Sequence, residues 1–464
     1  MKYFAGLILL IAFTAHGQSK YKVSYSDLLK YEGTYQYGNG GQLQIAANPK
    51  DTLLYAIIGE SRYRLRPSAK DEFLNNGNQQ IHFFFKGDLT DGYTVADATP
   101  NKFYKLLDRK ITFQKSAWIP RANGAQRWHY SVPAPRNDGL QTGPVAGSGL
   151  DSALLHKLVD RIVGGTYNDV HSVLIVKDDK LIFEEYFYEY DENRLHQLRS
   201  ASKSFSSALV GIALDKGLIK GRLEKVLPFF PEYNLDQGDP RKKLITIENM
   251  LTQQSGFDCD DDESSSKGNE VKIYPTHDWV KTVLDLPMVD APGHDAHYCS
   301  GNIFVLNQIV QNVSGKSLHA FAKENLFDKI GVERFDWDFV PDETHQDSYS
   351  QISLRPRDMV KFGLLYLHHG KWNNEQVISR EYVDASLTKH STLRGLGYGY
   401  LWWCEDLTVN GETFRGIAAK GNGGQRIFLW PDQNMMAVVT AGNYNTQSPS
   451  NRLLMECVLG GLRK

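Results

Sequence analysis

Alternating apolar and polar residues fill most of the first quarter of the chain, in short runs that turn residues separate. Residues 31–37 and 42–45 alternate on either side of Gly38-Asn39-Gly40-Gly41, and an Asn-Gly turn between two such runs is typical of a β-hairpin. The pattern predicts a small all-β domain over residues 18–116, either an antiparallel sheet or a barrel. Further strand-like runs lie at 52–58, 61–65, 80–85 and 103–107.

Helical and strand-like patterns mix further along the chain. Residues 117–150 hold several Pro and Gly residues that break any periodicity, which predicts a linker or a segment that wraps around a domain. Over residues 151–464 the order is strands, then helices, then strands, which predicts an α+β domain with an antiparallel sheet flanked by helices. Expected helices lie at 154–163, 204–214, 279–284, 303–313 and 356–368, and expected strands at 172–176, 181–187, 426–430 and 437–441.

The opening residues follow a different pattern. Met1-Lys2 is a basic start, residues 3–15 form an apolar run, and Ala15 and Gly17 are small. This is typical of a secretory signal peptide over residues 1–17, cleaved before Gln18. The apolar run is too short to cross a bilayer, which takes about 20 residues. We therefore expect a periplasmic or secreted protein with no membrane insertion after cleavage; the alternative is an N-terminal core helix.

Composition narrows the range of functions. Apolar residues make up 41% of the 464, which is enough to bury an ordinary core. The 52 Lys and Arg residues nearly balance the 54 Asp and Glu residues, so the formal charge is −2. A chain of this charge offers nucleic acid no electrostatic footprint, and we expect no such partner.

Neither a disulfide framework nor a metal site is expected. The chain has no CxxC pair and no HExxH motif, and its few cysteines are predicted to be mostly free, buried thiols. Aspartates at 258, 260 and 262 are spaced like the start of a calcium loop, but Glu263 stands where the sharp turn needs Gly. We expect an exposed acidic loop there, and no metal or cofactor. The cysteines are Cys259, Cys299, Cys404 and Cys457.

A Ser-x-x-Lys motif supplies the first candidate chemistry. It occurs four times, but only Ser200-Ala201-Ser202-Lys203 opens a long apolar helix. Residues three apart share a helix face, so Lys203 can take the Ser200 proton if its amine is kept neutral. Free N–H groups at a helix start can also stabilise an oxyanion. The alternative is that Ser200 is an ordinary helix N-cap. The other three copies begin at Ser19, Ser264 and Ser386.

Two more motifs follow in order. Tyr298-Cys299-Ser300 precedes a predicted helix, and the stretch from Ala419 to Gln425 reads Ala-Lys-Gly-Asn-Gly-Gly-Gln before a predicted strand. With Ser200-x-x-Lys203, the chain resembles the penicillin-recognising serine hydrolases, specifically the class C beta-lactamase-like family, which includes esterases, D-amino-acid peptidases and oligomer amidases. The resemblance covers about residues 150–464 and implies a beta-lactamase/transpeptidase-like fold. Supporting stretches lie at 250–256, 292–293, 357–358 and 398–403.

The resemblance implies a role for each motif residue. Ser200 would be the nucleophile that forms an acyl-enzyme, Lys203 its general base or proton carrier, and Tyr298 the shuttle to the leaving group. Ser300, two residues on, would project to the same side as Tyr298 and orient Lys203 or substrate. The backbone N–H groups of Ser200 and Asn422 would form the oxyanion hole. The amine and the phenol would both need pKa values several units below about 10. Taken by itself, Tyr298 is better interpreted as a packed core tyrosine with a satisfied hydroxyl.

The third motif departs from the family pattern. Ala419 takes the position of a cation and Lys420 that of a hydroxyl, ahead of Gly421. Neighbours on a strand face opposite sides, so Lys420 is not expected to replace the charge that holds substrate carboxylates in this family. Penicillin destruction and carboxypeptidase activity are therefore less expected than cleavage of less anionic esters or amides. Two aromatic residues, Tyr400 and Trp403, are predicted to line the substrate pocket.

These observations predict an exported serine hydrolase that cleaves ester or amide bonds of small-molecule or peptide-like substrates without a cofactor. One alternative is a catalytically weak penicillin-binding or D-peptidase-like protein, or a ligand-binding protein, of the same fold. Another is that the main role belongs to the N-terminal β domain, as a glycan- or partner-binding module.

Overall fold

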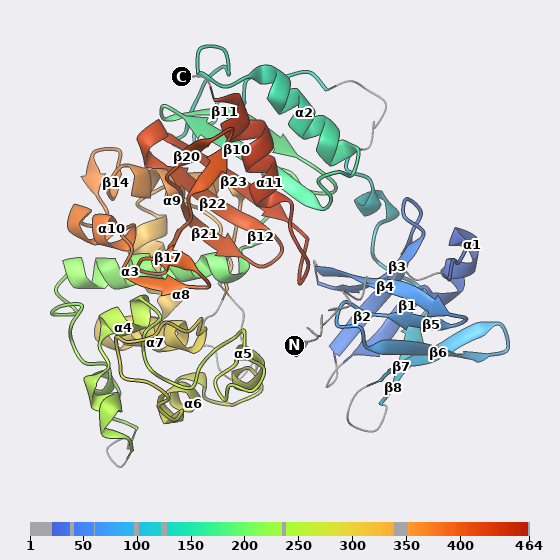
Figure 1. Ribbon diagram of the computed structural model, residues 1–464, viewed down its shortest axis with the longest axis horizontal. Coiled ribbons are helices and arrows are strands. Elements are labelled where there is room, and N and C mark those ends of the chain that lie inside the picture. Colours follow the sequence, from blue (N-terminus) through green and yellow to red (C-terminus); the bar gives the residue numbers. More distant parts are fainter. Residues whose placement is uncertain are drawn as a thin grey trace, which may run out of the picture. The chain divides into compact units, whose positions relative to one another are not determined.

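The computed structural model describes residues 21–37, 41–59, 61–96, 102–121, 128–233, 238–337 and 351–462, and the chain forms two compact units. The first is Met1–Trp118 and the second Ile119–Lys464. The predicted signal peptide and the turn at 38–40 lie outside the described residues. Figure 1 shows the elements of each unit, coloured along the sequence.

The first unit is a closed barrel in which β1 to β8 follow one another in sequence order and β1 pairs back with β8. Aromatic side chains fill its interior, among them Tyr35, Phe73 and Phe83, because alternate residues of each strand point inward. The sequence left an antiparallel sheet and a barrel as alternatives, and the structure shows the barrel. Its elements are α1 (Tyr25–Leu28), β1 (Gly33–Tyr37), β2 (Gly41–Asn48), β3 (Leu53–Ile58), β4 (Ser61–Ala69), β5 (Glu72–Leu74), β6 (Gln80–Lys86), β7 (Leu89–Val95) and β8 (Phe103–Asp108).

A nine-stranded sheet of order β16-β17-β18-β21-β22-β23-β10-β11-β9 forms the centre of the second unit. Neighbouring strands within the sheet are antiparallel except at one edge, where β9 lies parallel to β11. The prediction of an antiparallel sheet is therefore confirmed only in part. The strands are β9 (Gln141–Thr142), β10 (Val170–Lys177), β11 (Lys180–Tyr186), β16 (Ser391–Leu393), β17 (Leu396–Tyr398), β18 (Trp403–Cys404), β21 (Ile417–Gly421), β22 (Gln425–Trp430) and β23 (Met435–Ala441).

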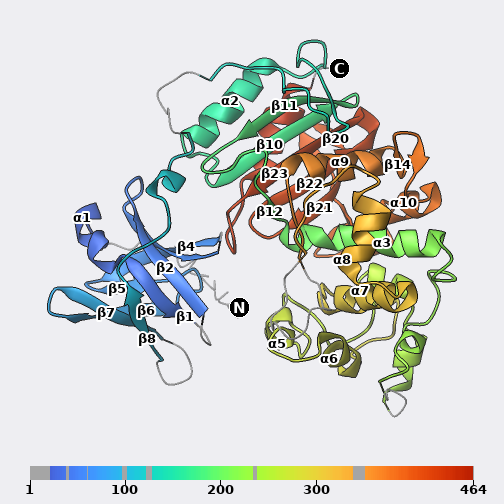
Figure 2. The same ribbon diagram turned by 180° about the vertical axis from the view of Figure 1, so that it is seen from behind.

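Helices cover both faces of this sheet (Figure 2). Along β10, Leu174 and Val176 pack with the helices of one face, whereas Val173 and Ile175 pack with those of the other, as the two-residue period of a strand requires. The first face holds α3 (Ser202–Asp215), α7 (Gly301–Ser314) and α9 (Pro356–Leu367), and the second holds α2 (Ser152–Val163) and α11 (Ser450–Leu453). Within the described part of the chain, each helix is too short or too polar to cross a bilayer.

Shorter elements complete the second unit. A 3-10 turn, η3 (Arg199–Ala201), leads directly into α3. In the described ranges of this unit, three two-stranded ribbons lie outside the main sheet. The remaining helices are α4 (Ile247–Leu251), α5 (Glu270–Ile273), α6 (Trp279–Asp285), α8 (Leu318–Ala322) and α10 (Arg380–Ser386), and the ribbon strands are β12 (His196–Gln197), β13 (Ser353–Leu354), β14 (Lys371–Trp372), β15 (Glu375–Gln376), β19 (Leu407–Val409) and β20 (Glu412–Phe414).

Two buried helices position the candidate site. Helix α3 is enclosed from Ser202 to Ala213, and α7 is buried along most of its length. A helix that is apolar around most of its circumference is stable only when other elements surround it, and α3 and α7 pack directly against each other. The predicted helices at 204–214 and 303–313 are thus confirmed. Their packing brings the start of α3 to the start of α7.

Candidate active site

The two ends of the Ser-x-x-Lys motif meet at the start of α3. Ser200 lies in η3 and Lys203 in the first turn of α3. The Lys203 ammonium donates to Ser200 Oγ at 3.2 Å and to Ser300 Oγ at 3.1 Å. Lys203 is 7% exposed, which is uncommon for lysine and requires partners of this kind. The spacing of three residues, from which the sequence predicted a shared helix face, therefore places Ser200 and Lys203 in direct contact.

Tyr298 joins the same group from the segment that precedes α7. The ring is 8% exposed and its centroid lies 4.8 Å from Lys203 Nζ. A second cation, the guanidinium of Arg394, lies 4.1 Å from the ring centroid. Cations near an aromatic ring are attracted to its negative face, so both positive groups stabilise the ring in this position. The structure thus brings Ser200, Lys203, Tyr298 and Ser300 together.

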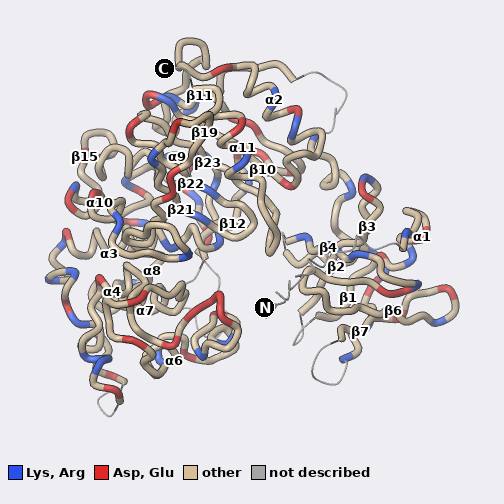
Figure 3. Tube along the Cα trace, in the orientation of Figure 1, with Lys and Arg blue, Asp and Glu red and all other residues tan. Residues whose placement is uncertain are grey.

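An acid pair lies behind Ser300, and sequence reasoning missed it. Asp261 Oδ2 accepts from the Ser300 hydroxyl at 2.6 Å and from the Ser300 backbone N–H at 2.9 Å. Glu270 Oε2 lies 3.1 Å from the same hydroxyl and accepts from Tyr274 at 2.8 Å. Asp261 belongs to the loop at 258–263, whose acidic residues are drawn red in Figure 3. That loop was expected to be exposed, but Asp261 is partly buried beside Ser300.

These acids change the charge state expected for the lysine. Burial lowers the pKa of Lys203, but Tyr298, Glu270 and Asp261 together outweigh burial and leave the pKa above its ordinary value. The prediction of a depressed pKa for Lys203 is therefore wrong, because Tyr298 and two carboxyl groups that the sequence did not reveal raise the pKa more than burial lowers it. Burial and the charge of Glu270 raise the pKa of Asp261 to about 6, against the opposing effects of Lys203 and Ser300.

A disulfide ties the acidic loop to the Tyr298 segment. Cys259 and Cys299 are bonded at a sequence separation of 40, while Cys404 and Cys457 are free. The expectation of mostly free thiols is therefore wrong for the first pair, since sequence spacing cannot show which cysteines the fold brings together. The bond fixes Asp261 close to Ser300, because the two cysteines are their near neighbours in the chain.

Gln253 holds the other side of the Tyr298 segment. Its side-chain oxygen accepts from the backbone N–H of Cys299 at 3.0 Å and from the Asn302 side chain at 3.1 Å. Gln253 is buried and has a φ of 63°, a left-handed conformation that is uncommon for a residue with a side chain. The stretch at 250–256 thus supports the site through a buried amide.

The third motif forms the end of β21 and the turn into β22. A Cβ on Gly421 would overlap the carbonyl oxygen of Leu198, so only Gly allows β21 to lie this close to η3. Asn422 is exposed, and its side chain is paired with Asn445 at 2.6 and 2.9 Å. Ala419 is fully buried and Lys420 pairs with Glu405 at 2.8 Å. The charge of Lys420 is therefore compensated by Glu405.

The two aromatic residues predicted to line the pocket have different surroundings. Trp403 is 5.9 Å from the Tyr298 ring, centroid to centroid, and is therefore part of the same group. Tyr400 is 1% exposed, donates to Glu248 and stacks on His390 at 4.4 Å. Tyr400 lies in the bend between β17 and β18, and its contacts are those of a packed core residue.

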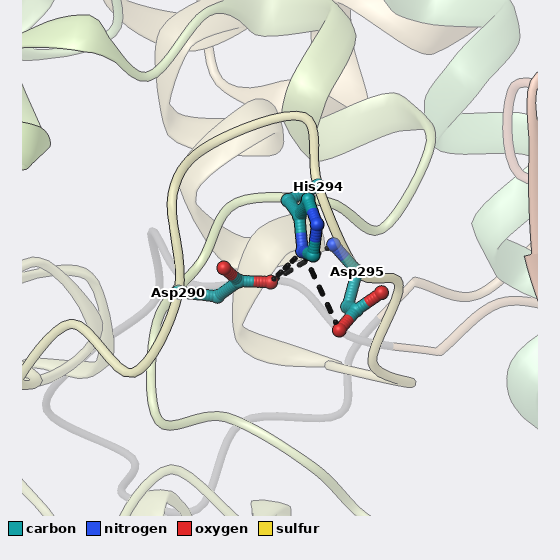
Figure 4. A group of neighbouring side chains, drawn as sticks. All are labelled: Asp290, His294 and Asp295. Atoms are coloured by element: carbon teal, nitrogen blue, oxygen red, sulfur yellow. Dashed lines mark hydrogen bonds and ion pairs between the residues drawn. The ribbon is translucent and has the colours of Figure 1, made fainter.

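One further group of polar side chains lies on the surface. Asp290, His294 and Asp295 approach one another in a turn before Tyr298 (Figure 4). His294 Nδ1 is 2.9 Å from Asp290 Oδ2 and 3.5 Å from Asp295 Oδ2. Hydrogen bonds from the Asp295 backbone N–H and from His294 lower the pKa of Asp290 to about 2. This arrangement is an ion-paired turn, and its exposed residues carry no assigned chemistry.

Comparison with known proteins finds a family that matches the second unit. Residues 155–456 match the family model described as Beta-lactamase. The 6-aminohexanoate-dimer hydrolase of Paenarthrobacter ureafaciens is 23% identical over an alignment of 299 residues, and the match covers 57% of this chain and 70% of that protein.

Solved structures share the fold. A family VIII carboxylesterase superposes with a TM-score of 0.55 at 14% identity and covers 68% of this chain and 98% of its own. A penicillin-binding protein homolog from Caulobacter crescentus superposes with a TM-score of 0.53 at 13% identity, over 69% of this chain and 99% of its own. The family match includes both Ser200 and the turn after β21, and the protein therefore belongs to the Beta-lactamase family.

Proposed function

We propose that the protein is an exported serine hydrolase that cleaves ester or amide bonds through an acyl-enzyme on Ser200. The observation that carries the proposal is the 3.2 Å hydrogen bond from the Lys203 ammonium to Ser200 Oγ, at the start of a buried helix. A serine becomes a useful nucleophile only when neighbouring groups remove its proton and stabilise the charge that develops. Lys203, Tyr298 and the backbone around Ser200 supply such groups.

Tyr298 is the proton acceptor in this proposal. Tyr298, Glu270 and Asp261 keep the pKa of Lys203 above its ordinary value, so the lysine is an ammonium and cannot take the proton of Ser200 in that state. Lys203 and Arg394 instead lie against the Tyr298 ring, where a negative charge on the tyrosine oxygen has two positive neighbours. The phenolate removes the Ser200 proton as Oγ attacks the carbonyl carbon, and the ammonium of Lys203 holds Oγ in place.

The remaining steps return every proton. Tyr298 passes the proton to the departing alcohol or amine as the bond to the carbonyl carbon breaks, which leaves the acyl group on Ser200. Water then attacks the acyl carbon and gives a proton to Tyr298, and Ser200 Oγ takes that proton back as the acid leaves. The backbone N–H groups of Ser200 and Asn422 stabilise the oxyanion in both steps. The close approach of Gly421 to Leu198 supports this placement of the turn.

The proposed substrate class follows from the two residues of β21, Ala419 and Lys420, that depart from the family pattern. Ala419 offers no cation, and Lys420 is paired with Glu405, so this strand has no uncompensated charge for a substrate carboxylate. Neutral or weakly anionic esters and amides fit such a site better than penicillins or peptide C-termini. Two similar proteins, the 6-aminohexanoate-dimer hydrolase and the family VIII carboxylesterase, are hydrolases, which supports a hydrolytic reaction.

Export to the periplasm or the medium belongs to the same proposal. The disulfide between Cys259 and Cys299 supports it, because structural disulfides persist in oxidising compartments and are rare in the cytosol.

A substrate panel tests the proposal. Purified full-length protein and Ser200→Ala are compared on p-nitrophenyl esters, anilides, D-alanyl peptides and nitrocefin. We expect the wild type to hydrolyse esters or anilides faster than nitrocefin, and Ser200→Ala to lose at least about 1000-fold in kcat/KM, since nucleophile removal abolishes the covalent route. Equal turnover by both proteins would contradict the proposal.

A second candidate is a binding protein that acylates slowly and does not turn over, as the buried Ala419 in place of a cation allows. Covalent labelling of Ser200 without hydrolysis of any panel member would favour it.

A further inference from the structure

The hydroxyl of Ser300 lies between one ammonium and two carboxyl groups. Ser300 Oγ accepts from Lys203 at 3.1 Å, and Asp261 and Glu270 lie 2.6 and 3.1 Å from the same oxygen. A hydroxyl has one hydrogen and can donate to one carboxylate at a time. Because the Asp261 contact is the shorter, the hydroxyl is assigned to Asp261, and Glu270 is left with the hydrogen bond from Tyr274.

Two carboxyl groups so close together, and partly buried, repel each other when both are ionised. The charged groups that face Asp261 are Glu270 from α5, Lys203 from α3 and Arg394 from the turn between β16 and β17. The Tyr298 carbonyl accepts from the Asp261 backbone N–H at 2.8 Å. Burial and Glu270 raise the pKa of Asp261 to about 6, while Lys203 and the hydrogen bonds from Ser300 lower it. Asp261 therefore changes charge within the range of pH in which enzymes are assayed.

We infer that Asp261 is a positioning residue whose ionised carboxylate, acting through Ser300, holds Lys203 against Ser200 and Tyr298, and that Glu270 tunes the pH at which this happens. The inference deepens the proposed function and rests on it. Neither carboxyl group needs to touch substrate, because the path runs from Asp261 to the Ser300 hydroxyl and from there to the Lys203 ammonium.

Protonation of Asp261 breaks this path. A neutral carboxyl no longer offers Ser300 a charged acceptor, and the Lys203 ammonium loses a negative charge nearby. The ammonium is then held less firmly beside Ser200 and the Tyr298 ring. Acylation should therefore fall as the pH drops through about 6.

The experiment measures the rate constant for covalent labelling of Ser200 by a fluorophosphonate between pH 4.5 and 9, on the full chain. For the wild type, the labelling rate constant should fall as the pH drops below about 6; this fall is the acid limb of the profile. Asp261→Asn keeps an acceptor oxygen for Ser300 but cannot ionise, so its rate should be at least about tenfold lower at pH 7.5 and its acid limb should disappear. Glu270→Gln removes the charge that raises the pKa of Asp261, so its acid limb should move to lower pH.

The matched control is Glu263→Gln, which removes a carboxylate from the same loop but an exposed one, and its profile should follow the wild type. An acid limb that persists near pH 6 in Asp261→Asn, or one that moves to higher pH in Glu270→Gln, would overturn the inference while leaving the proposed function intact. If the wild type shows no labelling of Ser200 at any pH, the proposed function falls and this inference falls with it.

Discussion

At the scale of single residues, the charge around Lys203 determines its role as much as its distance from Ser200. The amine contacts the nucleophile, but Tyr298, Glu270 and Asp261 raise its pKa more than burial lowers it. In the proposed mechanism the ammonium therefore orients Ser200 Oγ, and Tyr298 transfers the proton.

Gly421 gives a test at this scale. A Cβ at this position overlaps the Leu198 carbonyl, so Gly421→Ala must push β21 away from η3 and shift Ser200 relative to the turn at Asn422. We expect at least about a tenfold loss in kcat/KM and a loss of about 1–3 kcal/mol in the free energy of unfolding, which is typical of an overpacked core. Urea unfolding and ester kinetics measure the two effects.

Gly221→Ala is the matched control, because nothing lies within 4 Å of the position its Cβ would take. Unchanged kinetics in Gly421→Ala would show that β21 does not position the oxyanion hole.

Short-range spacing explains which site residues the sequence predicted. Ser200 and Lys203 are one helical turn apart and Tyr298 and Ser300 are two residues apart, so local geometry puts each pair on one side. Asp261 and Glu270 have no such spacing to either pair. They reach Ser300 only because the fold and a disulfide bring their loop there, and an acidic run looks like an exposed loop in sequence.

At the scale of elements, the long buried helices were the most predictable and the sheet edge the least. Helices α3 and α7 have an apolar repeat long enough to read from the sequence. Strand β9 has only two residues, which is too few to show a periodic pattern. Its parallel partner β11 lies beyond α2 and β10 in the chain, so no local signal predicts the pairing.

The disulfide belongs to this scale, because it joins the loop before α5 to the segment before α7. Closing a loop of about 40 residues stabilises a fold by about 4 kcal/mol in the chain-entropy account. We expect Cys259→Ser to lower the free energy of unfolding by about 2–4 kcal/mol and to slow fluorophosphonate labelling, since Asp261 is then less firmly placed. Urea titration and labelling rates check this.

Cys404→Ser, which removes a free and partly exposed thiol, serves as the control and should leave both quantities unchanged. Equal stability of wild type and Cys259→Ser would count against a structural role for the bond.

At the scale of the whole molecule, two separate cores indicate two separate folding units. The aromatic interior of the barrel and the two apolar layers around the nine-stranded sheet share no residues. Sequence alternation predicted the β-rich unit but left sheet and barrel open, because closure depends on the pairing of β1 with β8, which are far apart in the chain.

Separate cores predict two thermal transitions. Differential scanning calorimetry of the full chain should resolve two events, and a fluorophosphonate bound to Ser200 should raise only one of them, since a ligand stabilises the unit that binds it. A single transition that shifts as a whole on labelling would show that the two units unfold together.

The most direct test of the account is to trap the acyl-enzyme. Full-length protein is mixed with a p-nitrophenyl ester and quenched in acid within the first turnovers, and its peptides are weighed by mass spectrometry. The account predicts that the acyl mass is carried by the peptide that contains Ser200, and that Ser200→Ala shows no adduct. An adduct on another residue, or steady hydrolysis by Ser200→Ala at the wild-type rate, would contradict it.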